Sequence, residues 1–109
     1  MSRQKGNDAE ELAADYLKKE GFTLLERNFY AKKMGEIDII AHKDEVFHFI
    51  EVKSGKGFDP VYNLTPGKLH KIIKSAQLYL KQKNLDTAFC IDALIIRDGE
   101  IEFLENITL

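Results

Sequence analysis

Val46-Phe47-His48-Phe49-Ile50-Glu51-Val52-Lys53 decides the fold of this 109-residue chain, together with Gly35-Glu36-Ile37-Asp38-Ile39-Ile40 just before it. Both runs are rich in β-branched and aromatic residues, which favour strands. We expect strands over residues 36–41 and 46–54, joined by a short polar turn at Lys43-Asp44. The two strands are therefore predicted to form an antiparallel hairpin.

Three charged residues interrupt these apolar strands. Residues two apart in a strand share a face, so Glu51 and Lys53 are expected to lie on one face, beside Asp38 of the preceding strand. Burying two carboxylates and an ammonium costs free energy unless they are paired or serve a site. The grouping favours a hard-cation site with a lysine directed at a reacting group.

Capping signals place the other elements. Asn7 or Asp8 can cap a first helix, which Gly21 ends, and Thr65 can cap a second helix, which Asn84 closes. Apolar content predicts further strands, the last two joined by a tight turn, over residues 22–30, 88–96 and 100–104.

The resulting order is α-β-β-β-α-β-β. A helix between the third and fourth strands allows a right-handed crossover, which makes these two strands parallel. We expect an α/β protein of the α+β kind, with helices packed on a central mixed sheet. The length fits a single domain over residues 1–109.

Composition excludes several classes of protein. The single cysteine, Cys90, excludes an internal disulfide and a cysteine-based zinc cluster, and we interpret it as a small buried residue. The sequence contains no signal-peptide pattern and no membrane-length apolar run, so we expect a cytoplasmic protein without a membrane partner. A net charge of −2 argues against tight binding to nucleic acid but leaves room for a local basic face.

Asp38 and Glu51 suit Mg²⁺ (or Mn²⁺), which prefers carboxylate oxygens, and the backbone carbonyl of Val52 could be a third ligand. A metal-bound water has a lowered pKa and can attack phosphorus, while Lys53 could orient it or stabilise the developing charge. The alternative is a solvent-facing strand with a cross-strand pair of Glu and Lys.

Glu10 is a further candidate. At 100° per residue it lies roughly 95° from the centre of the first helix's apolar stripe, so it can lean toward the edge of the sheet, whereas Glu11 points to solvent. It is either a metal ligand or supporting acid near Asp38, or simply a partner of the helix dipole.

Several motifs together carry a family resemblance. Gly6-Asn7-Asp8-Ala9-Glu10, Gly35-Glu36-Ile37-Asp38, Phe49-Ile50-Glu51-Val52-Lys53, the helix over 65–80 and Asp92 resemble the YraN-like family of small bacterial proteins, which is uncharacterised. The resemblance covers about residues 4 to 100.

The YraN-like family is assigned to the PD-(D/E)XK nuclease superfamily and resembles archaeal Holliday-junction resolvases. The resemblance implies a restriction-endonuclease-like core, metal ligands at Asp38 and Glu51, a catalytic lysine at Lys53 and an accessory acid at Glu10. Ile37 replaces the superfamily's nominal proline. Relatives often have an arginine two residues beyond the lysine, whereas this chain has glycine there, and Lys56 is an imperfect substitute.

Basic residues flank the predicted site, and each could also belong to a solvated face. The nucleic-acid-binding candidates are Lys32, Lys33, Lys56, Lys68 and Lys71. The histidines show no ligand spacing, His48 is predicted on the strand face opposite Glu51, and no Cys-His arrangement is expected. Asp92 is either a structural acid satisfied by backbone donors or a residue at the edge of the site.

Two hypotheses follow. The first is a metal-dependent nuclease acting on DNA, including branched or structured DNA, for which a symmetric homodimer would suit a junction. The second is a non-catalytic nucleic-acid-binding or accessory protein on the same fold, which the acidic composition and the missing arginine favour.

Overall fold

The computed structural model describes residues 2–55, 59 and 64–108, with side chains from residue 8 onward. The predicted order of helices and strands is confirmed, with one short 3₁₀ helix added. The elements are α1 (Ser2–Lys19), β1 (Thr23–Tyr30), η1 (Lys32–Met34), β2 (Glu36–Lys43), β3 (Val46–Gly55), α2 (Pro66–Gln82), β4 (Phe89–Arg97) and β5 (Glu100–Leu104).

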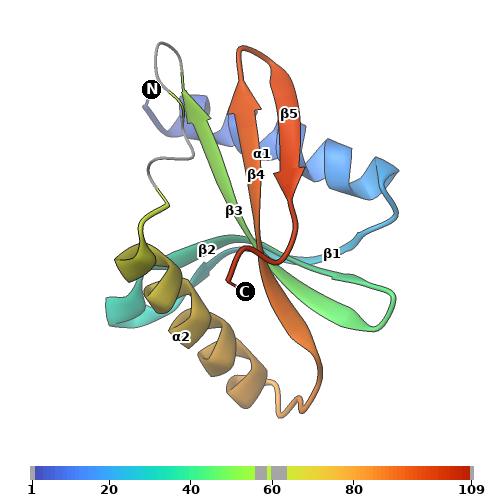
Figure 1. Cartoon of the computed structure of the whole chain (residues 1–109), viewed down its shortest axis with the longest axis vertical. Helices are drawn as coiled ribbons and strands as arrows, with labels where there is room; N and C mark the ends of the chain where they lie inside the picture. The colour runs from blue at the N-terminus through green and yellow to red at the C-terminus, as the bar shows by residue number, and fades with distance from the viewer. Residues whose placement is uncertain (1, 56–58, 60–63, 109) are drawn as a thin grey trace.

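The five strands form one mixed sheet in the order β1-β2-β3-β4-β5. β3 and β4 are parallel, as predicted from the intervening helix, and the other neighbouring pairs are antiparallel. Figure 1 shows α1 passing behind β3 and β4, whereas α2 lies in front of the sheet beside β2.

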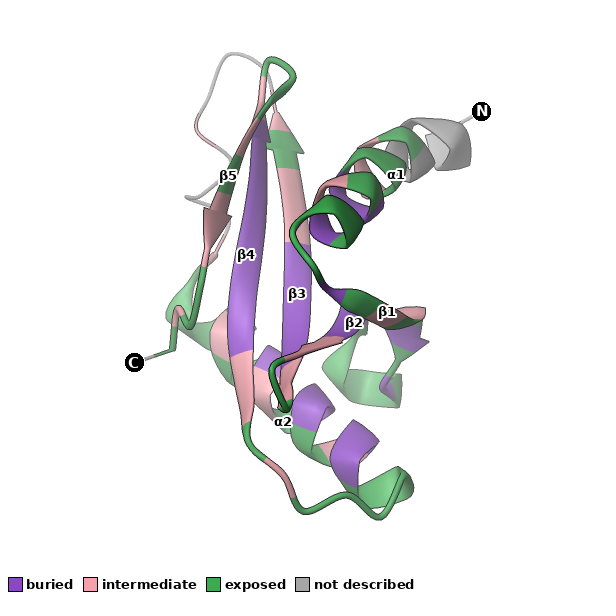
Figure 2. Ribbon diagram, turned by 90° about the vertical axis from the view of Figure 1, so that its right-hand side faces the viewer, coloured by how far each residue is buried: buried purple, intermediate pink, exposed green. Residues whose placement is uncertain are grey.

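Each helix covers its own apolar cluster. On the α1 face, Leu17 packs with Ile50 and Leu94. On the α2 face, Ala76 and Tyr79 pack with strand residues that include Phe49 and Ile91. β3 and β4 are therefore buried along their central length (Figure 2), and Ile50 lies on the opposite face from its neighbour Phe49.

The signals predicted for the end of α1 and for both ends of α2 are confirmed. Gly21 follows α1 with φ +93°, and Asn84 follows α2 with φ +56°, so both take the left-handed conformation that ends a helix. The Thr65 hydroxyl accepts a hydrogen bond from the backbone N–H of Lys68 (3.3 Å) at the start of α2.

Two predicted boundaries are wrong. α1 begins at Ser2, so Asn7 and Asp8 lie inside the helix rather than at its N-terminus, because the preceding Arg, Gln and Lys residues are good helix formers. The turn between β2 and β3 is Asp44-Glu45 rather than Lys43-Asp44. Both turn residues have positive φ, as a two-residue hairpin of this type requires, and Lys43 still pairs with Val46.

Within the described part of the chain, neither helix combines the length and the apolar character needed to cross a membrane.

Candidate active site

The candidate site lies where β2 and β3 diverge. Their last paired residues at this end are Ile39 and Ile50. β2 continues along β1 to Glu36, and β3 continues along β4 to Gly55. Beyond the last pair, a side chain replaces the ladder, because Asp38 Oδ2 accepts a hydrogen bond from the backbone N–H of Val52 (2.8 Å). Beyond this point, the facing edges of β2 and β3 are not paired with each other and leave an opening between the two strands.

Glu51 and Lys53 lie on β3 just beyond its last pair with β2. The Glu51 side chain is 10% exposed and that of Lys53 is 26% exposed, with 3.9 Å between Lys53 Nζ and Glu51 Oε2. Asp38 is half-buried beside them. The structure thus brings together the two acids and the amine that strand periodicity grouped on one face.

Glu10 of α1 reaches the same region. Its side chain is 17% exposed, and its charge raises the pKa of Asp38. Arg27 of β1 contacts both acids of this helix turn. Its Nη1 donates a hydrogen bond to Glu11 Oε1 (2.6 Å), and its Nη2 lies 3.7 Å from Glu10 Oε1. Glu11 is exposed, as the helical angle predicted, while Glu10 turns inward.

The two central carboxyl groups are held in an environment that disfavours their charge. The pKa of Glu51 is raised to about 8, chiefly by burial and secondly by the charge of Asp38. The pKa of Asp38 is raised to about 6, again chiefly by burial, although the hydrogen bond from Val52 lowers it. Lys53 lowers both pKa values without offsetting these effects. Without a bound cation, the pair therefore retains about one proton near neutral pH.

Two buried carboxylate oxygens make no hydrogen bond among the described residues, namely Glu10 Oε1 and Glu51 Oε1. Glu10 Oε1 has only the longer ion pair with Arg27, at 3.7 Å. A buried acceptor without a donor costs free energy, and a divalent cation would satisfy it. The donor set of carboxylate oxygens is the one that Mg²⁺ and Mn²⁺ prefer.

A small pocket of about 110 Å³ adjoins the carboxylates on the α2 face. Glu51 and Glu36 line it from the sheet, and Lys68 and Lys71 line it from α2. Two of the predicted phosphate-binding lysines therefore stand across a pocket from the carboxylates. An anionic group in this pocket can contact both a cation bound to the carboxylates and the ammonium group of a lysine on α2.

Comparison with known proteins places the chain in a family. Residues 9–96 match the uncharacterised protein family UPF0102. The chain belongs to this family. A UPF0102 protein of Wolinella succinogenes is 62% identical over the full length of both chains, and one of Sulfurovum sp. (strain NBC37-1) is 62% identical over 95% of this chain and 93% of its own. A Helicobacter pylori (strain HPAG1) relative is 58% identical over 97% and 92%.

This family membership confirms the YraN-like resemblance. The names of these relatives state no activity, so the role of each residue in this UPF0102 protein is argued from its own geometry.

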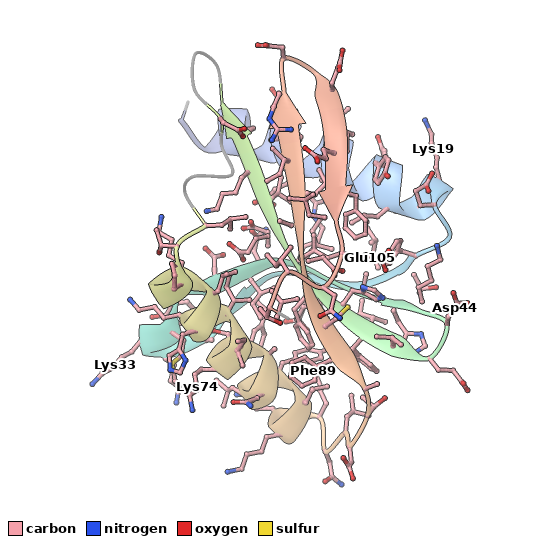
Figure 3. All side chains as sticks on the ribbon, in the orientation of Figure 1. Lys19, Lys33, Asp44, Lys74, Phe89 and Glu105 are labelled. Atoms are coloured by element: carbon pink, nitrogen blue, oxygen red, sulfur yellow. The ribbon has the colours of Figure 1, made fainter. Side chains whose placement is uncertain are left out.

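The remaining predicted basic residues are spread out. Lys32 and Lys33 are exposed on η1, and Figure 3 shows Lys33 projecting from the side of the molecule that carries α2. Lys56 lies outside the described residues. Arg27, a further basic residue in β1, is engaged by the acids of α1.

Sequence reasoning missed Glu36 as a member of the site. It lines the pocket, and its charge raises the pKa of both Asp38 and Glu51. The signal was present, because Glu36 is two residues before Asp38 in one strand and should share its face.

The expectation that no Cys-His arrangement forms is wrong. Cys90 Sγ lies 3.1 Å from His48 Nδ1, and Asp92 contacts both side chains. Cys90 is half-buried and polar in its contacts rather than a simple apolar residue. Asp92 is a buried acid that accepts from the backbone N–H of Asn106 (2.8 Å), as its structural interpretation predicted, and it belongs to this second cluster.

Proposed function

We propose that this UPF0102 protein is a divalent-metal-dependent nuclease that hydrolyses phosphodiester bonds in DNA. The observation that carries the proposal is the pair of the half-buried Asp38 and the buried Glu51 at the β2–β3 opening, with Lys53 Nζ 3.9 Å from a Glu51 oxygen. If Glu51 served only to pair with Lys53, its other oxygen, Oε1, would have no hydrogen-bond partner among the described residues.

Asp38 and Glu51 would hold Mg²⁺ or Mn²⁺. The raised pKa of each carboxyl group reflects repulsion and burial that a bound cation would relieve. Val52 would contribute its backbone carbonyl, and Glu10 would support the ion from α1. When bound, such an ion supplies Lewis-acid activation for phosphodiester hydrolysis.

Lysines would hold the substrate. Lys53 can donate to a phosphate oxygen on which negative charge develops in the transition state. Lys68 and Lys71 line the adjoining pocket and can neutralise a neighbouring phosphate. Lys32 and Lys33, exposed on η1, would extend this contact along the backbone of the nucleic acid.

We further propose a restriction-endonuclease-like core, with which a five-stranded mixed sheet between two helices is compatible. Fold does not fix activity, so the argument for hydrolysis rests on the site. One chain of 109 residues covers little duplex, and a symmetric homodimer would suit a branched or structured DNA substrate.

A second candidate is a non-catalytic nucleic-acid-binding or accessory protein. The net charge of −2 favours it, because phosphate neutralisation supplies most non-specific affinity for nucleic acid. The engagement of Arg27 by Glu10 and Glu11 removes one more cation from the surface available to phosphate.

Cleavage assays on a panel of linear, flapped and four-way-junction DNA, with Mg²⁺ or Mn²⁺, separate the two. The nuclease proposal predicts metal-dependent cleavage that Lys53→Ala abolishes while DNA binding is unchanged. Lys19→Ala is the matched control, because this exposed lysine ends α1 on the opposite side of the molecule from Lys33 (Figure 3). Binding without cleavage under both metals would favour the accessory role, and cleavage retained in Lys53→Ala would contradict the assigned mechanism.

A further inference from the structure

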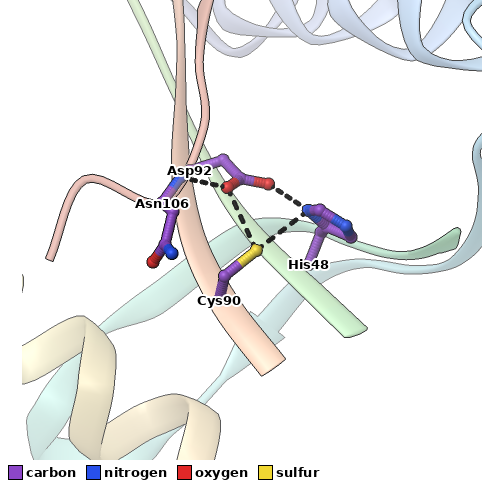
Figure 4. A network of polar contacts seen from close by, with 4 residues as sticks. All are labelled: His48, Cys90, Asp92 and Asn106. Carbon is purple, nitrogen blue, oxygen red and sulfur yellow. Dashed lines mark hydrogen bonds and ion pairs between the residues drawn. The ribbon is translucent and has the colours of Figure 1, made fainter. Parts of the chain in front are cut away.

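The second polar cluster of the molecule lies on the other face of β3. His48 pairs with Cys90 across the parallel β3–β4 ladder, and Asp92 follows two residues later on the same face of β4. Figure 4 shows the three side chains converging, with Asn106 beside Asp92. Glu51 is an odd number of residues from His48 and so faces away from this cluster.

The convergence is close. Asp92 Oδ2 lies 2.5 Å from His48 Nδ1, Cys90 Sγ lies 3.1 Å from the same nitrogen, and Cys90 Sγ lies 3.3 Å from Asp92 Oδ1. One nitrogen, one sulfur and one oxygen therefore lie within 4.8 Å of one another. Nitrogen, sulfur and oxygen donors of this kind suit a borderline-soft ion rather than Mg²⁺.

A catalytic triad does not explain this geometry. In a triad, the histidine uses one ring nitrogen for the carboxylate and the other for the nucleophile. Here Cys90 and Asp92 both approach Nδ1, so the ring cannot relay a proton between them. The pKa of Cys90 is raised to about 12, chiefly by burial, which also makes the thiol a poor nucleophile.

We propose that His48, Cys90 and Asp92 form a binding site for a thiophilic divalent metal ion, Zn²⁺ in the first instance. In a tetrahedral zinc site, neighbouring ligand atoms are separated by about 3.3–3.5 Å. The contact of Cys90 with Asp92 already has this spacing, the contact of Cys90 with His48 must widen by a few tenths of an ångström, and the contact of His48 with Asp92 must widen by less than about 1 Å. Small side-chain rotations achieve this without moving the strands.

Access and a fourth ligand are available. A pocket of about 470 Å³ opens beside the cluster and is lined by His48, Cys90, Glu105 and Asn106. Glu105 is exposed at this pocket and offers a carboxylate to complete four-coordination. On binding, the Cys90 thiol loses its proton to solvent, and the His48 ring proton resides on Nε2 so that Nδ1 presents its lone pair.

The site is tested with Co²⁺, which replaces Zn²⁺ and gives an absorption band when a thiolate binds it. The reduced, metal-stripped full-length chain is titrated with Co²⁺. Because Cys90 is the only cysteine, a thiolate-to-cobalt band can arise from no other residue. We expect the band to saturate at one Co²⁺ per chain, to vanish on adding equimolar Zn²⁺ and to persist in excess Mg²⁺. No band from the folded chain in excess Co²⁺ would overturn the proposal.

Variants locate the site. Cys90→Ser removes the band, and His48→Gln weakens Co²⁺ binding by more than about 100-fold, since even supporting residues contribute 10–100-fold. His42→Gln is the matched control, because this histidine packs edge-to-face against Phe47 outside the cluster, so its substitution should leave Co²⁺ binding unchanged. Unchanged Co²⁺ affinity in His48→Gln would overturn the assignment. If that variant does not fold, the Co²⁺ titration of the wild-type protein still tests whether the metal site exists. Retention of the band in Asp38→Asn shows that the site is independent of the proposed nuclease centre.

Discussion

Two polar clusters are buried in the same sheet, and they differ in how their charges are satisfied. Around Asp38 and Glu51, like charges face one another, and the buried oxygen Glu51 Oε1 makes no hydrogen bond within the described part of the chain. Around Asp92, a single carboxylate receives the backbone N–H of Asn106 and contacts His48 and Cys90. The polar groups of the first cluster are therefore left unsatisfied when no cation is bound, whereas those of the second satisfy one another even in the metal-free protein.

The difference between the two clusters indicates where a bound cation lowers the free energy of the folded state. A buried network whose members satisfy one another contributes to stability by itself, whereas repelling carboxylates are retained at a cost. We therefore expect removal of Asp92 to destabilise the protein, and removal of the Glu51 charge to stabilise the metal-free protein.

The largest expected effect is that of Asp92→Ala. The substitution leaves His48 and the Asn106 N–H without their buried partner, so the free energy of unfolding should fall by about 3 kcal/mol. Urea denaturation of the metal-free protein measures it. Asp15→Ala, at an exposed acid of α1, should change stability by less than about 0.5 kcal/mol, and equal effects of the two substitutions would contradict the network.

Mg²⁺ should stabilise the wild-type protein. At ten times the dissociation constant, binding to the folded state alone adds about 1.4 kcal/mol, or roughly 5 °C in Tm. Thermal melts with and without Mg²⁺ measure this shift. Asp38→Asn should lose the shift while Asp92→Asn keeps it, and a Mg²⁺ shift that survives in Asp38→Asn would assign the ion elsewhere.

The stability of the metal-free protein should fall as the pH rises, because the pKa values of two carboxyl groups are raised in the folded state. The folded state holds protons on Asp38 and Glu51 that the unfolded state releases near pH 4, so this contribution to stability is lost as pH rises from about 4 to about 8. Glu51→Gln should remove most of this loss and be more stable than the wild type at pH 8, on the order of 1 kcal/mol, but not at pH 5. Urea titrations in EDTA at both pH values test it.

Glu11→Gln is the control for that measurement. Glu11 is exposed, and its hydrogen bond with Arg27 lowers its pKa, so neutralising it should give no gain at pH 8. A gain in both variants would indicate a general effect of net charge rather than one of burial.

The smallest expected effect is that of Arg27→Ala. Its ion pairs with Glu10 and Glu11 are partly exposed, so their loss should cost less than about 1 kcal/mol. Mg²⁺ binding should persist, because Asp38 and Glu51 remain. Isothermal titration with Mg²⁺ measures this, and complete loss of binding would make the Arg27–Glu10 contact essential to the cation site.

Local periodicity predicted much of the first cluster. Alternation along two adjacent strands grouped Asp38, Glu51 and Lys53, and the helical angle turned Glu10 inward. The same rule would have added Glu36. Turn chemistry likewise predicted Asp98-Gly99, where both residues have positive φ.

The second cluster could not be predicted in this way. His48 and Cys90 are 42 residues apart, and their contact depends on the register of a parallel pair joined through α2. A hairpin turn fixes the register of adjacent strands, but a long crossover leaves register to the packing of the whole core. No spacing of residues in the sequence encodes that outcome.

The most direct test of the cation site is a crystal of the protein soaked in Mn²⁺, examined by anomalous scattering. We expect a Mn²⁺ peak between Asp38 and Glu51, within coordination distance of Glu51 Oε1. Crystals in which Mn²⁺ occupies other positions and these two carboxylates contact only protein or solvent would contradict it.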